Sequence, residues 1–365
     1  LALTMMMSLV TINAGAKEFT DDEELNYKEA VDVISEISVV DGYEDGSFKP
    51  QNTLTRGAAA KIICNLILGP TTAAELHADT APYKDVPVSN TFSGYIAYCA
   101  KEGIISGYAD GSFRPAGTLT GYAFMKMLLG ALGYDATYEG YTGGNWSINV
   151  AKQAIGIGLN KGLVDEFNGV DFVTREEAAL YAFNTLKATM VDYDQKITTN
   201  VNGVDVTISQ GNAKPVTWTE GINEDGNIKN DGFVQFAEEF FPKLVRKDDN
   251  DKFMAPANTW VYDKSEIGTY ERTDLIVETY TTKVTGKDAY DLLKSGVIKD
   301  NDLEVYLDGV VPTGSELFDK DDMVRSNTSK LGATGDGVMT TVKLDTDKDV
   351  ITFVAIKTWL AKATA

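Results

Sequence analysis

The chain has 365 residues, of which 43% are hydrophobic, so it is long enough for two or three domains with apolar cores. Its 33 basic and 54 acidic side chains give a formal net charge of −21 at pH 7. This charge argues against a nucleic acid or an anionic membrane surface as a partner, and any anionic ligand would need a local basic pocket.

The first sixteen residues have the composition of an export signal. Residues 1–12 form an apolar run that is too short to span a bilayer, and Ala14-Gly15-Ala16 supplies a small-x-small cleavage pattern. We therefore predict that 1–16 is the remnant of a signal peptide and that the protein is secreted. No later stretch of the sequence is apolar over membrane-spanning length, so we predict no membrane span.

Cys64 and Cys99 are the two cysteines of the chain. Two cysteines provide neither a disulfide framework nor a thiolate metal cluster. Both lie in segments with a helical pattern. Two buried free thiols are the favoured interpretation, and a single Cys64–Cys99 disulfide remains the alternative.

A nonapeptide occurs twice, as GYEDGSFKP from Gly42 and as GYADGSFRP from Gly107. Each copy is preceded and followed by a segment with apolar residues at helical spacing. A divergent third copy keeps both helical segments, the second of them reading VTREEAALYAFNTL, but lacks the Asp-Gly-Ser-Phe loop. We predict three helix-loop-helix repeats, at about 19–70, 83–135 and 138–193, packed around one shared core.

Each trailing helix begins at a predicted threonine N-cap, namely Thr55, Thr120 and Thr174. We expect exposed helix N-termini there, whose free N–H groups attract an anion. Arg56 and Arg175 follow the caps of the first and third repeats and add donors that can hold a carboxylate in two places. In the second repeat, Gly121 follows the cap instead. The simpler alternative is that both arginines are solvated residues of a first helical turn.

Together these segments resemble three S-layer homology (SLH) motifs, carried by GYEDGSFKPQNTLTRGAAAKII, GYADGSFRPAGTLTGYAFMKML and VTREEAALYAF and covering about residues 19–193. The resemblance implies an all-α pseudo-threefold spindle. It also implies non-covalent attachment to an acidic secondary cell-wall polysaccharide on peptidoglycan, often one with pyruvate ketals. The expected location is the cell wall or S-layer of a Gram-positive-type bacterium.

By the same resemblance, the polysaccharide-binding residues are Arg56, Arg175, Asp45, Gly46, Lys49, Asp110, Gly111, Arg114 and Trp146. The two arginines after the caps would contact the acidic saccharide, and the Asp-Gly pairs would shape the groove walls. The basic loop residues would add charge, and the tryptophan would stack on a sugar ring. Because Gly121 replaces an arginine of the motif, we expect unequal grooves, with the second one weak or silent.

Residues 195–365 alternate Thr and Val between Gly, Asp and Asn turns, which predicts a small β-rich domain with helices near GFVQFAEEFF and KDAYDLLKSG. The whole chain is thus predicted to be a multi-domain α+β protein. The acidic stretches RKDDNDK, DKDD and DTDKD are interpreted as solvated turns, with a structural calcium site as the alternative, and no cofactor is predicted. Trp218, Trp260 and Trp359 are assigned to the core.

The function that the SLH resemblance implies, together with the export signal, is non-enzymatic anchoring of an exported surface or S-layer protein, with copies of the chain itself as further partners in a surface lattice. The alternative is a wall-associated enzyme tethered by its SLH motifs, such as a glycoside hydrolase with its catalytic domain in a missing C-terminal extension. Such an enzyme needs two carboxylates at a defined separation, and no stretch of 195–365 resembles a hydrolase motif.

Overall fold

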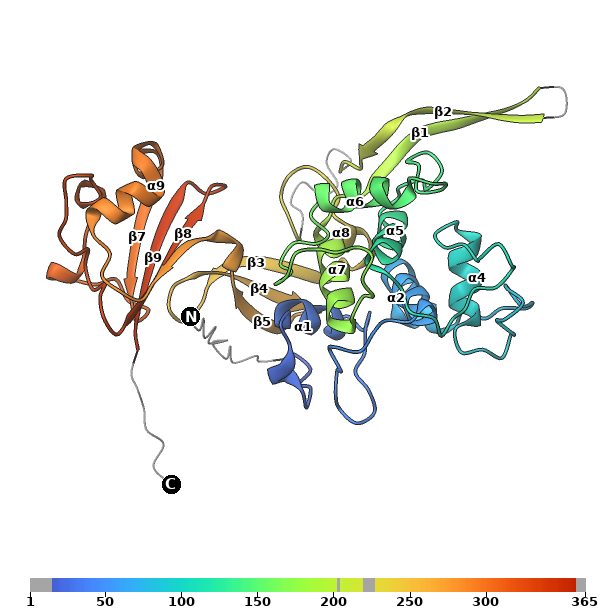
Figure 1. Ribbon diagram of the computed structural model, residues 1–365, viewed down its shortest axis with the longest axis horizontal. Helices are drawn as coiled ribbons and strands as arrows, with labels where there is room; N and C mark the ends of the chain where they lie inside the picture. Colours follow the sequence, from blue (N-terminus) through green and yellow to red (C-terminus); the bar gives the residue numbers. More distant parts are fainter. Residues whose placement is uncertain (1–14, 202–203, 219–226, 359–365) are drawn as a thin grey trace. The chain divides into compact units, whose positions relative to one another are not determined.

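The computed structural model describes residues 15–201, 204–218 and 227–358 (Figure 1). Apart from residues 15 and 16, the predicted signal peptide lies outside the described residues, and so does Trp359. The chain divides into two compact units. Among the described residues, the helical unit lies within 15–246 and 260–268, and the C-terminal unit lies within 247–259 and 269–358. Each unit is described by itself.

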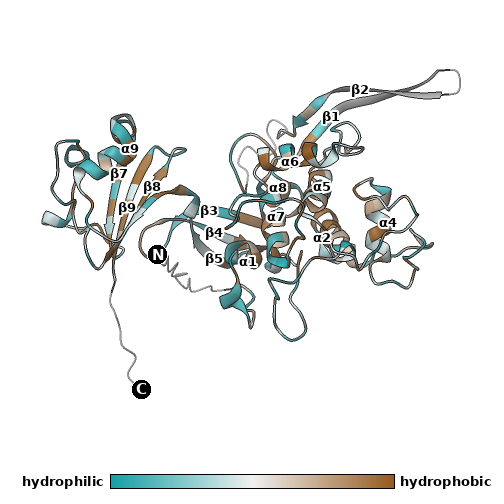
Figure 2. Cartoon of the chain, viewed as in Figure 1, coloured by the Kyte–Doolittle hydropathy of each residue, from teal (hydrophilic) through white to brown (hydrophobic). Residues whose placement is uncertain are grey.

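The predicted helix pairs are present in the helical unit. They are α1 (Lys28–Glu36) with α2 (Arg56–Leu68), α4 (Ser93–Lys101) with α5 (Gly121–Ala131), and α6 (Trp146–Gly156) with α7 (Arg175–Lys187). Two short helices, α3 (Pro70–Ala74) and α8 (Phe236–Phe240), and a 3-10 turn at Asp22–Glu24 complete the described helical elements of this unit. The apolar stripes face inward, and Figure 2 colours α5 mostly as hydrophobic, in agreement with the burial of seven of its residues.

Threonine N-caps start all three trailing helices, as the sequence predicts. The Oγ1 atoms of Thr55, Thr120 and Thr174 accept hydrogen bonds from the backbone N–H three residues further on, at 3.2, 3.4 and 3.2 Å. Thr174 also forms the predicted capping box with Glu177, whose carboxylate accepts the Thr174 N–H at 2.7 Å. Each cap satisfies a donor that the helix itself leaves unpaired.

A closed ring of backbone hydrogen bonds joins the three repeats just before these caps. The Leu54 N–H donates to the Val173 carbonyl at 2.7 Å, Leu119 donates to Leu54 at 3.2 Å, and Val173 donates to Leu119 at 3.0 Å. All three side chains are buried. Because each repeat both donates and accepts once, the three trailing helices start around one common point.

The described β-strands form three sheets. β1 (Val191–Val201) and β2 (Val204–Pro215) form an antiparallel hairpin of the helical unit, drawn near α5 and α6 in Figure 1. A second sheet has the order β3 (Leu244–Asn250), β4 (Pro256–Tyr262), β5 (Ser265–Glu271). The third has the order β6 (Ile276–Tyr280), β8 (Val338–Asp345), β9 (Val350–Lys357), β7 (Asp302–Leu307), in which β7 and β9 are parallel.

In the C-terminal unit, α9 (Gly286–Asp300) and the strands of the third sheet supply a common hydrophobic core, which includes Leu293, Val342 and Phe353. Short 3-10 turns occur at Thr273–Leu275, Gly314–Glu316 and Lys320–Asp322. Helix α8 of the helical unit, helix α9 and strands β6 to β9 confirm elements that the sequence predicts within 195–365. The described chain thus combines helices with several β-sheets.

One sequence interpretation is wrong, and two strands were not predicted. The stretch RKDDNDK, interpreted as a turn, lies mostly in strand β3, whose last four side chains are exposed. Strands β4 and β5 were not predicted at all, because their sequences lack a clear alternation of apolar and polar residues. By contrast, Trp260 is fully buried, as expected, whereas Trp218 is only partly buried.

Candidate functional site

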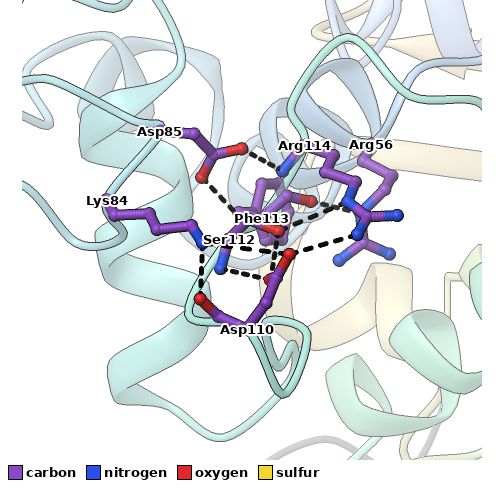
Figure 3. Close-up of polar contacts among 7 residues, drawn as sticks. All are labelled: Arg56, Lys84, Asp85, Asp110, Ser112, Phe113 and Arg114. Atoms are coloured by element: carbon purple, nitrogen blue, oxygen red, sulfur yellow. Dashed lines mark hydrogen bonds and ion pairs between the residues drawn. The ribbon is translucent and has the colours of Figure 1, made fainter.

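Arg56, the first residue of α2, lies against the loop of the second repeat. Its Nε donates to the Phe113 carbonyl at 2.8 Å (Figure 3). Its Nη2 donates to the Ser106 carbonyl at 3.2 Å. The guanidinium also lies 4.4 Å from the ring centre of Phe113 and 5.0 Å from that of Tyr108. Burial lowers the pKa of Arg56. An arginine of one repeat therefore holds the loop of the next.

Arg175, the first residue of α7, makes the equivalent contact with the loop of the first repeat. Its Nε donates to the Phe48 carbonyl at 2.9 Å and its Nη2 to the Asp41 carbonyl at 2.9 Å. Its guanidinium lies 4.6 Å from the centre of the Tyr43 ring. Burial lowers the pKa of Arg175 as well. Neither arginine is the freely solvated side chain of the simpler sequence interpretation.

At the third contact, α5 meets the divergent loop of the third repeat. Gly121 stands where the other two helices carry arginine, and Tyr122 packs edge-on against Phe167 at 5.9 Å. A Cβ on Gly169 would lie 2.1 Å from the Tyr122 ring, so this ring approaches the loop backbone directly. The missing arginine and the missing Asp-Gly-Ser-Phe motif, which lie far apart in the sequence, belong to one and the same contact.

A pocket of about 150 Å³ lies at this third contact. Its lining includes the acidic residues Asp165, Glu166, Asp171 and Glu177 and no arginine or lysine. Like charges repel an anion, so this pocket does not suit an acidic ligand. The prediction of unequal grooves is thus placed at the contact of α5 with the third loop, rather than at the second loop.

The helix N-termini are not free, contrary to our expectation. The Arg56 and Gly57 N–H groups donate to the Gly117 and Pro115 carbonyls, both at 2.9 Å. The other two helices repeat the pattern, with Gly121 and Tyr122 donating to Asp171 and Gly169, and Arg175 and Glu176 donating to Asn52 and Pro50. The threonine caps occupy the next N–H groups, so carbonyls of a neighbouring repeat take the donors that were assigned to an anion.

The predicted Asp-Gly pairs build tight turns at the loop tips. Asp45 and Asp110 each accept hydrogen bonds from the backbone N–H and the hydroxyl of the serine two residues on. Gly46 and Gly111 have φ of +80°, a conformation that favours glycine. The Ser112 hydroxyl and N–H lower the pKa of Asp110 to about 2.

The basic loop residues pair with these aspartates. Lys49 lies 2.8 Å from the Asp45 carboxylate, and Arg114 lies 3.3 Å from that of Asp110. The hydrogen bond from Lys49 is the largest cause that lowers the pKa of Asp45. In the structure the carboxylates therefore neutralise part of the charge that Lys49 and Arg114 were expected to offer a ligand.

Sequence reasoning missed two aspartates, each of which fixes the base of one loop. The Asp85 carboxylate accepts the N–H groups of Phe113 and Arg114, both at 2.7 Å (Figure 3). Asp21 accepts those of Phe48 and Lys49 at the same distances. Lys49 and Arg114 are held with φ of +54° and +60°, which is uncommon for residues other than glycine.

The Phe113 N–H is the largest cause that lowers the pKa of Asp85. The signal for these aspartates is an aromatic-x-Asp triplet, Phe19-Thr20-Asp21 and Tyr83-Lys84-Asp85, which precedes each loop by a similar distance. The triplet extends the repeat beyond the nonapeptide.

A larger pocket, of about 350 Å³, lies beside Arg56. The second loop, α5 and the start of α6 line it, so all three repeats contribute to it. It brings two predicted site residues, Arg56 and Trp146, to one place and adds Lys126 of α5, which sequence reasoning missed. The signal for Lys126 was a single cation within the apolar run FMKMLL.

Lys126 and Arg56 carry positive charge in this pocket without a carboxylate partner among the described residues. Lys126 is half-buried, burial lowers its pKa, and its Nζ lies 5.9 Å from the centre of the Trp146 ring. The hydrogen bonds of Arg56 use Nε and Nη2, so Nη1 has no acceptor within the described part of the chain. Burying a cation without a counter-ion is costly, and an anionic ligand would remove that cost.

The predicted site residues thus fall into two groups. Asp110, Gly111 and Arg114 belong to the loop that Arg56 holds, and Trp146 joins Arg56 in the pocket. Asp45, Gly46 and Lys49 form the loop that Arg175 holds. Their role in binding stays a prediction.

The described residues contain no helix that is both long and apolar enough to cross a membrane. Nor do they contain a group of three or more His, Cys, Asp or Glu side chains placed to hold a metal ion.

Comparison with known proteins supports the assignment of the first two repeats. The S-layer homology domain family matches residues 18–60 and 82–121. An uncharacterized cell wall amidase of Bacillus anthracis is 28% identical over 40% of this chain and 28% of its own length. A cellulosome-anchoring protein of Acetivibrio thermocellus is 28% identical over 34% of this chain and 30% of its own length. An S-layer protein of Bacillus thuringiensis subsp. finitimus is 25% identical over 88% of this chain and 40% of its own length.

These matches and the repeated loops define a bacterial cell-surface protein. Its SLH matches and its S-layer relatives support an SLH-domain protein located at the cell wall or surface of a Gram-positive-type bacterium. The chain spans less than half the length of each of the three relatives.

Proposed function

We propose that the three repeats form a pseudo-threefold SLH spindle that anchors the protein to an acidic secondary cell-wall polysaccharide. The hydrogen-bond ring through Leu54, Leu119 and Val173 supports the threefold arrangement, because equivalent residues of the three repeats occupy equivalent places in it. The anchoring role agrees with the name of the cellulosome-anchoring relative.

The observation that carries this proposal is the pocket of about 350 Å³, with two cations lacking a carboxylate partner among the described residues and one aromatic ring. A guanidinium binds a carboxylate through two N–H groups, and the remaining donors of Arg56 are available for that. Lys126 of helix α5 supplies a second positive charge. The Trp146 ring offers a flat apolar surface for a sugar face, so a saccharide with a carboxylate substituent, such as a pyruvate ketal, fits this chemistry.

We infer that the three grooves differ in binding. The pocket beside Arg56 contains two cations, and Arg175 makes the equivalent contact with the first loop, whereas the contact of Gly121 with the third loop is acidic and occupied by the Tyr122 ring. Two grooves are therefore proposed to bind polysaccharide, and the third is proposed to act in packing alone.

Co-sedimentation of the full chain with purified cell walls tests the proposal. Walls that retain their polysaccharide should bring the protein into the pellet. Walls treated with mild acid, which hydrolyses ketals, should retain much less of it. If the protein stays in the supernatant with untreated walls, or sediments equally with both preparations, the proposed ligand is wrong.

A matched pair of variants tests the pocket. Lys126→Ala removes a pocket cation that makes no ion pair with a described residue, and we expect at least a tenfold weaker affinity. Lys101→Ala removes an exposed lysine at the end of α4, and we expect unchanged affinity. Equal losses in both variants would mean that general charge, rather than the pocket, governs binding.

A wall-associated enzyme remains the second candidate, because one relative is named a cell wall amidase. The complete reading frame would discriminate between the two functions. Further Thr/Val-rich β modules would favour a lattice protein that assembles with copies of itself, and a recognisable amidase or glycoside hydrolase domain would favour the tethered enzyme.

A further inference from the structure

We propose that Cys64 and Cys99 form an intramolecular disulfide that ties the first repeat to the second. The two cysteines of this chain lie on different helices, α2 and α4, yet their Sγ atoms are 3.5 Å apart. Both residues are fully buried. In the structure both are free thiols, and the disulfide is the state that they would reach on oxidation.

The geometry requires only a small movement. The sulfur atoms of a disulfide are about 2.05 Å apart, so the two Sγ atoms must approach by about 1.5 Å. Each thiol lies 3.6 Å from a backbone carbonyl oxygen of the facing helix, Cys64 from Tyr95 and Cys99 from Ala60. These neighbours show that the two sulfurs point toward each other across the contact between α2 and α4.

The location of the protein supplies the chemical conditions. A cell-surface protein lies outside the reducing cytoplasm, in surroundings in which disulfides form and persist. Oxidation proceeds by exchange with a low-molecular-weight disulfide, RSSR. One cysteine thiolate attacks RSSR and releases one RSH, and the second cysteine then attacks the mixed disulfide and releases the other. The protein loses two protons and two electrons, and RSSR is reduced to two thiols.

The burial of both sulfurs fixes when this exchange takes place. The hydrogen bond with Cys99, and after it burial, raise the pKa of the Cys64 thiol, so the nucleophilic thiolate is scarce in the folded protein. An external disulfide also has no direct access to either sulfur. The exchange therefore takes place while the chain folds, before α2 and α4 close, and the finished disulfide is then protected from reductants.

The first experiment counts thiols in the full-length wild-type chain, so it needs no variant. The protein is refolded from urea in a buffer of oxidised and reduced glutathione, and then denatured in the presence of a maleimide-polyethylene glycol reagent. We expect no modified cysteine, and two after reduction in denaturant. Mass spectrometry should find the Cys64 and Cys99 peptides joined, two hydrogen masses lighter than their sum. Two reactive thiols without reduction would overturn the proposal.

The second experiment measures protection and stability. A reductant added without denaturant should leave the disulfide intact over a period in which the denatured protein is fully reduced; equally rapid reduction would overturn the inferred protection. Closing this loop should make the oxidised protein melt about 5 to 10 °C above the reduced protein. The double variant Cys64→Ala/Cys99→Ala should melt at one temperature in both buffers. A wild-type protein that also melts at one temperature would count against the cross-link.

Discussion

Replacement of Arg56 by alanine should destabilise the second loop as well as weaken any ligand contact. The side chain is partly buried and donates hydrogen bonds to the backbone carbonyls of Phe113 and Ser106. Phe113 is only 1% exposed. Water does not readily replace a donor at a buried residue. The Arg56→Ala variant therefore leaves at least one carbonyl poorly satisfied.

The magnitude follows from these contacts. A hydrogen bond from a charged group contributes about 1.5 to 3 kcal/mol, and a cation–π contact about 0.5 to 1 kcal/mol. Because the guanidinium is partly solvated and the contributions do not add fully, we expect a loss of about 2 to 3 kcal/mol. For a unit of this size, that loss lowers Tm by about 5 to 10 °C.

Differential scanning calorimetry of the full chain measures this effect. Arg175→Ala should produce a similar decrease, because it removes the equivalent contact with the first loop. Lys84→Ala is the matched control: its Nζ also donates to a loop carbonyl, that of Asp110, but the side chain is 59% exposed, so Tm should change by less than about 1 °C.

If Arg56→Ala melts within about 1 °C of the wild type, the arginine does not hold the loop and our reasoning is refuted. If it melts as expected, wall binding of the variant has to be measured well below its Tm. Only then does a loss of affinity report on the ligand rather than on a loosened loop.

Two further substitutions test the framework around the loops. Asp85→Asn should lower Tm at pH 7, and the difference from the wild type should shrink as the pH falls below about 4. The lowered pKa means that the ionised Asp85 stabilises the fold at higher pH and loses this effect on protonation; a difference independent of pH would contradict this. Glu176→Ala should cost about 3 kcal/mol in urea unfolding, because this buried carboxylate accepts three hydrogen bonds from Asn26 and Gln51. A loss below about 1 kcal/mol would show that solvent replaces these bonds.

Local chemistry made much of the helical unit predictable from the sequence. Helix starts could be predicted at Thr55, Thr120 and Thr174, because a threonine cap needs only its own side chain and a backbone N–H three residues away. The Asp-Gly turns are equally local. By contrast, β4 and β5 were missed because pairing with neighbouring strands, rather than an alternating pattern, stabilises them.

The sequence by itself therefore determined the repeated helix pairs, their caps and their turns, since each depends on residues a few positions apart. Only the tertiary structure decided which arginine meets which loop, that carbonyls of neighbouring repeats occupy the helix N-termini, and that Lys126 shares a pocket with Arg56. These contacts join segments tens of residues apart. They depend on the closure of three repeats into one ring, a long-range event that no local pattern records.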